Sequence, residues 1–91
     1  MTAKVRMPPV LRQQVGGARE VDVAGGTLRE ALDDLFERHP GVREGLVDAE
    51  GNLNRFVNVY VQNEDVRLGQ GLETPVPDQG TIIVLPAMAG G

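Results

Sequence analysis

The sequence contains no cysteine, and it has little of three other things: lysine, aromatic residues and long apolar runs. Without cysteine the chain forms no disulfide, no thiolate metal site and no cysteine nucleophile. No stretch approaches the roughly 20 apolar residues of a membrane helix, and no signal peptide opens the chain. We therefore expect a cytoplasmic protein without a membrane partner.

Positive charge is also scarce. Nine Lys and Arg residues stand against thirteen Asp and Glu residues, which gives a formal net charge of −4. Proteins that bind nucleic acid usually carry a basic stripe, and the sequence shows none, so we expect no nucleic-acid partner. A mildly acidic surface would suit a basic patch on a protein partner, but it can equally serve solubility alone.

The 91 residues, of which 41% are hydrophobic, predict a single small domain with a modest core. Residues 4–7 alternate between polar and apolar, Gly16-Gly17 supplies a turn, and residues 19–23 resume the alternation. Together these segments predict a β-hairpin. Val10-Leu11 can continue the first strand beyond the break at Pro8-Pro9.

The clearest local signal predicts an α-helix that begins after Thr27. Thr27 and Glu30 have the spacing of a capping box, and His39-Pro40-Gly41 is a stop signal. Between them, apolar residues recur at helical spacing and form one stripe: Leu28, Ala31, Leu32, Leu35 and Phe36. The pairs Arg29–Asp33 and Asp34–Arg38 are expected to form ion pairs on the solvated side of this helix.

The second half of the chain predicts strands. Residues 55–61 carry the strongest strand pattern, with Val57, Val59 and Val61 expected to face the helix and the opposite face formed by Phe56, Asn58 and Tyr60. Residues 42–51 predict a turn of helix or a loop, residues 66–68 a short returning strand, and residues 77–80 a turn. Residues 81–85 are apolar on both faces, which predicts an interior strand.

The resulting order is hairpin, helix, strand, short strand, strand. One main helix packed across one face of a mixed sheet is an α+β arrangement. With the first and last strands parallel and adjacent, this is the order of the β-grasp, or ubiquitin-like, fold. We expect residues 1–86 to form this domain and residues 87–91 to form a flexible C-terminal Gly-Gly tail.

The chain is organised around its last residues. Pro86 has no backbone N–H to donate to a sheet, so it is a natural place for pairing to end. Gly90 and Gly91 lack a Cβ and can enter a space that rejects other residues. We expect the tail to offer its terminal α-carboxylate to an enzyme. Chain ends are also commonly frayed, and a binding module that merely uses this scaffold stays open.

The strand order, residues 55–67 and the ending Leu85-Pro86-Ala87-Met88-Ala89-Gly90-Gly91 together resemble the MoaD/ThiS family of ubiquitin-like sulfur carriers. Nearly the whole chain takes part, and the branch it resembles most is the CysO branch, which serves cysteine synthesis by an O-phosphoserine-dependent route. The resemblance implies a protein co-substrate and not an enzyme. An E1-like enzyme would use ATP to adenylate the carboxylate of Gly91, and a sulfur donor would displace AMP to leave a thiocarboxylate. A cysteine synthase-like enzyme would accept the sulfur, and a zinc metalloprotease would release the cysteine adduct.

The resemblance makes Gly91 the attachment point, with Gly90 beside it. The rest of the tail is expected to contact partners: Pro86, Ala87, Met88 and Ala89. Phe56 and Tyr60 are candidates for a separate docking surface on the domain, but each could instead pack beneath a loop or a neighbouring strand. No bound cofactor is implied, because ATP is used by the activating enzyme.

No metal or nucleotide site is expected on the chain. Gly25-Gly26 before the helix lacks the Gly-Lys-[Ser/Thr] of a phosphate loop, which favours a turn followed by a cap. His39 lies near acidic residues in the sequence, but a lone histidine at a helix end is typical of a favourable C-terminal charge. Asp33-Asp34 is interpreted as solvated helix surface.

Two related functions stay open. The first is the small subunit of molybdopterin synthase, in which the same thiocarboxylate feeds dithiolene formation. The second is a ubiquitin-like modifier joined to target lysines, because the same acyl-adenylate can end in an amide. Lys4 is the single lysine of this sequence, so branched polymers have little to build on.

Overall fold

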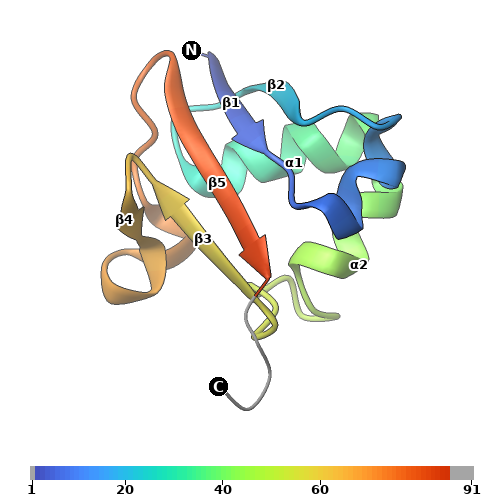
Figure 1. The fold of residues 1–91 in the computed structure, drawn as a ribbon. Coiled ribbons are helices and arrows are strands. Elements are labelled where there is room, and N and C mark those ends of the chain that lie inside the picture. Colours follow the sequence, from blue (N-terminus) through green and yellow to red (C-terminus); the bar gives the residue numbers. More distant parts are fainter. Residues whose placement is uncertain (1, 87–91) are drawn as a thin grey trace.

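The computed structural model describes residues 2–86. Their strands form a five-stranded sheet of order β2-β1-β5-β3-β4 (Figure 1). The strands are β1 (Thr2–Arg6), β2 (Glu20–Ala24), β3 (Val57–Val61), β4 (Glu64–Asp65) and β5 (Gly80–Pro86). β1 and β5 pair in parallel and the other pairs are antiparallel. The predicted mixed sheet, with its first and last strands adjacent, is therefore confirmed.

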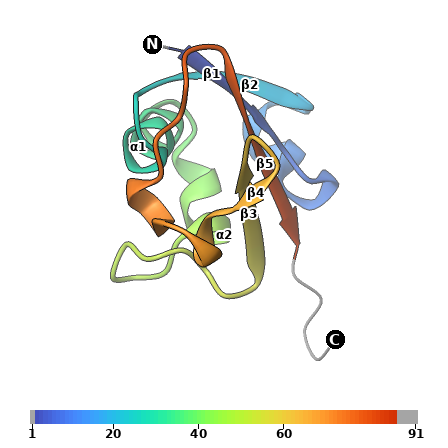
Figure 2. The same ribbon diagram turned by 90° about the vertical axis from the view of Figure 1, so that its left-hand side faces the viewer.

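Two α-helices lie on one side of the sheet, α1 (Leu28–Arg38) and the short α2 (Arg43–Leu46) (Figure 2). The described residues also contain four 3-10 helices: η1 (Pro9–Val15), η2 (Pro40–Val42), η3 (Val66–Leu68) and η4 (Gly71–Glu73). Within residues 2–86 no α-helix covers the other side of the sheet, which we call the open face.

The core fills the space between the sheet and α1. Val5, Ile82 and Val61 stand opposite one another on three neighbouring strands, and each is at most 4% exposed. The helix contributes the stripe predicted from the sequence, which is buried throughout: Leu28, Ala31, Leu32, Leu35 and Phe36. No polar or charged residue in the described range is buried, so burial of apolar surface and close packing hold the two layers together.

The start of α1 confirms the predicted cap. The Glu30 N–H donates to Thr27 Oγ1 at 3.2 Å, and the Glu30 carboxylate accepts from the Gly26 N–H at 2.8 Å. Gly25 has a φ of 153°, and a Cβ there would lie 2.6 Å from the backbone nitrogen of Ala31. Glycine at this position therefore lets the chain pass from β2 into the helix at close range.

Several local predictions were wrong. Val10-Leu11 does not extend β1, because Pro9 starts the 3-10 helix η1, where its fixed φ and missing N–H are tolerated. Residues 66–68 form the 3-10 helix η3 in place of a strand, and the side chain of Asp65 caps it by accepting from the Arg67 N–H. Arg29 pairs with Glu73 at 2.7 Å in place of Asp33.

The outer edge of β2 is bonded to α1. The Ala24 N–H donates to Asp34 Oδ2 at 2.8 Å, and Arg38 Nη2 donates to the carbonyl oxygen of Asp22. Arg38 Nη2 also reaches Asp34 Oδ2 at 2.8 Å, as the sequence predicted. Asp34 therefore joins the helix to the sheet and is not simply solvated surface. Bonds of this kind occupy backbone groups that an edge strand would otherwise offer to another chain.

Candidate functional site

The site begins where the sheet ends. Pro86 is the last residue of β5, is exposed, and stands opposite Val57 at the start of β3. Pro86 is also the last residue that the structure describes, so the expected end of strand pairing there stays a prediction. The remaining predicted tail residues lie outside the described range, so their roles stay predictions: Ala87, Met88, Ala89, Gly90 and Gly91.

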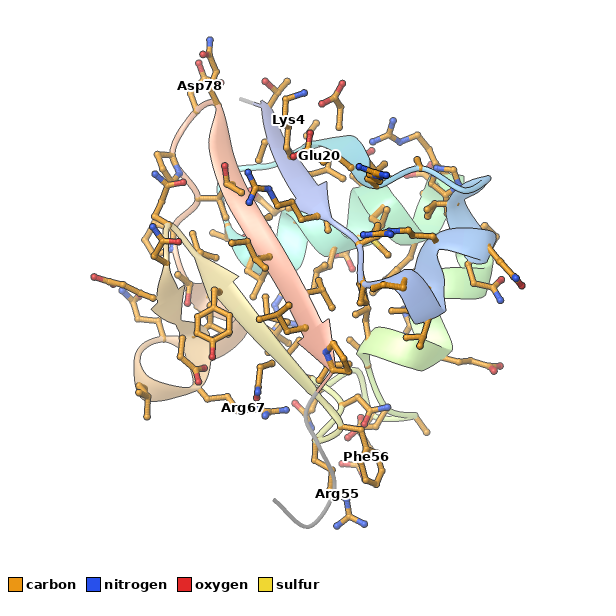
Figure 3. All side chains as sticks on the ribbon, in the orientation of Figure 1. Lys4, Glu20, Arg55, Phe56, Arg67 and Asp78 are labelled. Atoms are coloured by element: carbon orange, nitrogen blue, oxygen red, sulfur yellow. The ribbon has the colours of Figure 1, made fainter. Side chains whose placement is uncertain are left out.

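Phe56 lies in the turn before β3, at the same end of the sheet (Figure 3). Its N–H donates to Asn54 Oδ1 at 2.9 Å, and the Arg67 guanidinium donates to the Asn54 carbonyl oxygen and to Asn58 Oδ1. Phe56 is 51% exposed as a residue, and the Arg55 guanidinium carbon lies 5.2 Å from the centroid of its ring. The hydrogen bonds hold the turn, which presents an exposed aromatic ring next to the end of β5.

Tyr60 lies farther along β3, where it is half-buried and stands opposite Ile83 of β5. Tyr60 lies four positions after Phe56, which corresponds to about 13 Å along an extended chain. The two rings therefore do not form one contact patch by themselves. Leu85, which is 45% exposed, stands opposite Asn58 between them. We call Phe56, Tyr60, Ile83 and Leu85 the apolar strip.

Ile83 and Leu85 were missed as candidates because residues 81–85 were predicted only as an interior strand that is apolar on both faces, and β5 does lie in the middle of the sheet. Only Ile82 and Val84 are buried, at 0% and 1% exposed, and the alternate residues lie on the open face. The signal that could have found them was the count of helices: one main helix covers one face of a sheet, so an apolar residue on the other face needs a different partner.

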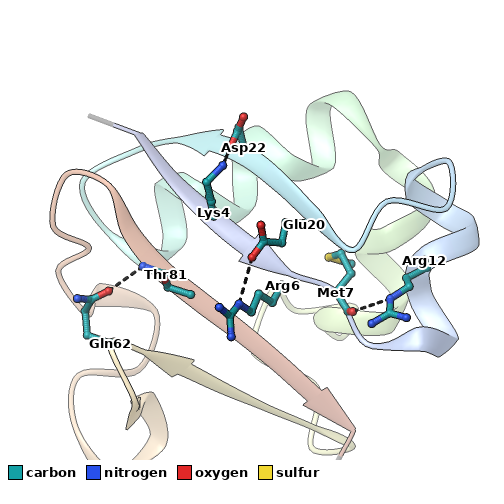
Figure 4. Close-up of polar contacts among 8 residues, drawn as sticks. All are labelled: Lys4, Arg6, Met7, Arg12, Glu20, Asp22, Gln62 and Thr81. Carbon is teal, nitrogen blue, oxygen red and sulfur yellow. Dashed lines mark hydrogen bonds and ion pairs between the residues drawn. The ribbon is translucent and has the colours of Figure 1, made fainter.

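Charged residues flank the apolar strip on β1 and β2. Lys4 Nζ pairs with Asp22 at 2.9 Å, and Arg6 Nε pairs with Glu20 at 3.1 Å (Figure 4). The hydrogen bond and charge of Asp22 raise the pKa of Lys4 above its ordinary 10.5. The ion pair with Asp22 therefore favours the protonated form of the Lys4 amine, which is not nucleophilic.

The described residues hold no group of three or more His, Cys, Asp or Glu side chains that could bind a metal ion. The first amides of α1 are occupied by the chain itself, because Glu30 donates to Thr27 and the Leu28 N–H donates to the Thr74 carbonyl oxygen. The helix start is thus used for capping and for contact with the loop after η4. None of the helices within residues 2–86 is long and apolar enough to cross a bilayer.

The model of the ThiS family matches residues 5–91. The chain belongs to the ThiS family. Among ThiS-type relatives, the sulfur carrier protein CysO of Mycobacterium tuberculosis is 42% identical over 93 residues, covering all of both chains. A putative sulfur carrier protein of Archaeoglobus fulgidus is 30% identical, again over all of both chains.

A solved structure of a related carrier has the same fold as this chain. A chain in the crystal structure of the Amycolatopsis orientalis BexX/CysO complex is 46% identical and superposes with a TM-score of 0.89, covering 98% of this chain and 99% of that one. The predicted β-grasp fold and sulfur-carrier family are confirmed, as is the expected role of protein co-substrate in place of enzyme.

Proposed function

We propose that this chain is a cytoplasmic sulfur carrier whose Gly91 carboxylate becomes a thiocarboxylate and donates sulfur in cysteine biosynthesis. The observation that supports this most is the family match, which runs through residue 91 and so includes Gly90-Gly91. The 42% identity to CysO, which extends over the full length of both chains, supports the cysteine branch over the small subunit of molybdopterin synthase. No resident cofactor is needed, because ATP is consumed by the activating enzyme.

The chemistry requires an activated carboxyl group. A carboxylate oxygen of Gly91 attacks the α-phosphorus of ATP and pyrophosphate leaves, which gives an acyl-adenylate. A sulfide-level donor then attacks the carbonyl carbon and AMP leaves, so one oxygen of the carboxylate has been replaced by sulfur. The acyl-adenylate must be kept from water during this exchange, which calls for a narrow channel, and two glycines fit such a channel better than any residue with a Cβ.

A terminal segment alone binds weakly, because part of its docking energy is consumed in ordering it. The apolar strip on the open face offers a second contact surface, since exposed apolar residues beside the end of β5 would be covered by the protein that receives the tail. The expected partners are an E1-like activating enzyme, a cysteine synthase-like acceptor and a zinc metalloprotease. The BexX/CysO complex of Amycolatopsis orientalis supports direct contact between such a carrier and another protein.

The alternative of a ubiquitin-like modifier predicts an isopeptide bond between Gly91 and a lysine of another protein. Chain growth on this protein would have to use Lys4, whose raised pKa disfavours the neutral amine that attacks an acyl group. Single attachment to other proteins is unaffected by this argument. Isopeptide-linked Gly91 on cellular proteins would support the modifier.

The test is loading in vitro. The chain is incubated with the E1-like enzyme of the same genome, ATP and sulfide, and is then examined by intact mass and by thiol-specific alkylation. Alkylation is needed because oxidation of Met1, Met7 or Met88 mimics the mass gain of exchanging oxygen for sulfur. Since the chain has no cysteine, an alkylated product indicates a thiocarboxylate.

Two variants sharpen the loading test. Deletion of Gly90-Gly91 should abolish loading and leave the thermal unfolding midpoint nearly unchanged. Gly91→Val should fold normally and resist adenylation, because a β-branched residue crowds the reacting carbonyl. Loading of Gly91→Val at the wild-type rate would contradict the steric argument, and normal sulfur transfer by the deletion variant would contradict the proposed function.

A further inference from the structure

A broad surface hollow of about 520 Å³ lies where the β1–β2 hairpin leaves the sheet. Its lining residues, which we call the arginine hollow, are Arg6, Met7, Arg12, Arg19 and Glu20. Three arginines and one glutamate thus line the hollow, in a protein whose formal net charge is −4. Three of the nine basic residues of the chain therefore line one hollow. Charge that served solubility alone would not need to be concentrated in this way.

The arginines of the hollow retain free hydrogen-bonding capacity. Arg6 uses Nε for Glu20 at 3.1 Å, and Arg12 uses Nε for the Met7 carbonyl oxygen at 3.2 Å (Figure 4). Within residues 2–86, neither the Nη groups of these two arginines nor any side-chain nitrogen of Arg19 donates a hydrogen bond to the protein. A guanidinium has five N–H donors arranged to bind carboxylates, so the hollow offers paired donors to an anionic ligand.

The hollow lies next to the apolar strip on the open face. Arg6 stands opposite Ile83 in the sheet register, and Pro86 follows Ile83 by three residues, which is about 10 Å along β5. A protein that covers the apolar strip and receives the chain end therefore also extends over the arginine hollow. The Lys4–Asp22 pair farther along β1 is internally neutralised and does not add to this positive field.

We propose that the arginine hollow binds carboxylates on an acidic surface of the activating enzyme, an inference that rests on the proposed function. The hollow is wide and exposed, and the Arg6 side chain alone is 58% exposed. A single small anion would be weakly held by such scattered and hydrated groups, whereas several carboxylates fixed on one protein surface engage them together. Charges at the rim of an interface mainly raise the association rate, which suits a carrier that must bind and leave in every cycle.

The experiment compares two double variants that lose the same charge. The first, Arg12→Gln with Arg19→Gln, alters the hollow. The control, Arg29→Gln with Arg43→Gln, alters the helix side, where Arg29 pairs with Glu73 and Arg43 lies over Phe36. Loading by the E1-like enzyme of the same genome, with ATP and sulfide, is followed as KM and kcat for the carrier at low and high salt.

We expect the hollow variant to raise KM about fivefold to tenfold at low salt with kcat unchanged, and the control to change KM by less than about twofold. The difference should shrink at about 0.5 M salt, where charges separated by more than a few ångströms are screened. Arg12→Lys with Arg19→Lys keeps the charge and should recover most of the wild-type KM. Arg19→Gln alone should give part of the effect, and thermal unfolding verifies that each variant is folded.

Equal KM for the hollow variant and the control would overturn the inference while leaving the proposed function intact, as would an increase in KM that salt does not reduce. Binding of inorganic phosphate that Arg12→Gln with Arg19→Gln abolishes at constant ionic strength would also overturn it, by assigning the hollow to a small anion. If the wild-type chain is not loaded under any salt condition, the proposed function fails and the inference fails with it.

Discussion

Asp34→Ala should destabilise this protein far more than an ordinary surface substitution. Asp34 Oδ2 accepts hydrogen bonds from the Ala24 N–H and from Arg38 Nη2, both at 2.8 Å. The Asp34 side chain is 29% exposed, and it connects α1 to the outer edge of β2. Its removal leaves the Ala24 N–H without its partner and frees Arg38, which also donates to the Asp22 carbonyl oxygen.

The expected magnitude follows from these contacts. A hydrogen bond to a charged group contributes about 1.5–3 kcal/mol net, and the partial exposure of Asp34 places it at the lower end of that range. The ion pair with Arg38, four residues on, adds about 0.3–0.5 kcal/mol. We therefore expect a loss of about 1.5–2 kcal/mol in the free energy of unfolding, which in a domain of this size lowers Tm by roughly 6–16 °C.

The assay is urea unfolding followed by circular dichroism, with Asp33→Ala as the matched control. Asp33 lies beside Asp34 on the same helix, is exposed, and makes no hydrogen bond or ion pair within the described residues. Both variants lose one negative charge and gain one alanine in α1. Asp34→Asn, which keeps an acceptor oxygen, should fall between wild type and Asp34→Ala. Equal stability of Asp33→Ala and Asp34→Ala would refute the assignment of Asp34 to the sheet edge.

The remaining predictions concern the core and the single lysine. Leu32→Ala should lower the free energy of unfolding by about 2–4 kcal/mol and Val59→Ala by less, because both are 1% exposed but valine loses fewer buried carbons; urea unfolding with an unchanged m-value measures this. Asp22→Asn should lower the pKa of Lys4, followed by NMR through its side-chain carbon; an unchanged pKa would contradict the ion pair. Because the folded pKa is raised, the pair stabilises the protein below the ordinary lysine value of 10.5, and this contribution is lost as the pH rises through the folded pKa.

The helix was predictable because its signals are local and agree with one another. Thr27 and Glu30 form the cap within four residues of chain, and the apolar stripe after them needs only one covering surface. The order of the strands was predictable for a similar reason. The alternating pattern of β1 and the apolar run of β5 were the segments best suited to the sheet interior, and both strands lie there.

The pairs that depend on tertiary contact could not be read from spacing. Arg29 has Asp33 at the ideal helical spacing, yet its Nε pairs with Glu73, which η4 brings alongside α1. Arg67 belonged to a predicted strand, yet its guanidinium reaches Asn54, thirteen residues earlier in the chain. In both cases a long side chain found a partner whose position is set by packing and not by sequence separation.

The exposed side of β5 carries the most information about function. Residues 81–85 were predicted to form an interior strand because they are apolar on both faces, and β5 is the central strand of the sheet. The sheet has helices on one side, and so Ile83 and Leu85 are left at the open face while Ile82 and Val84 fill the core. Folding does not require these two side chains to be apolar, whereas covering by a partner does. Contact between the open face and another protein during loading would account for the apolar residues on this side of β5. Substitution of Leu85 by a polar residue should then weaken loading without lowering the free energy of unfolding.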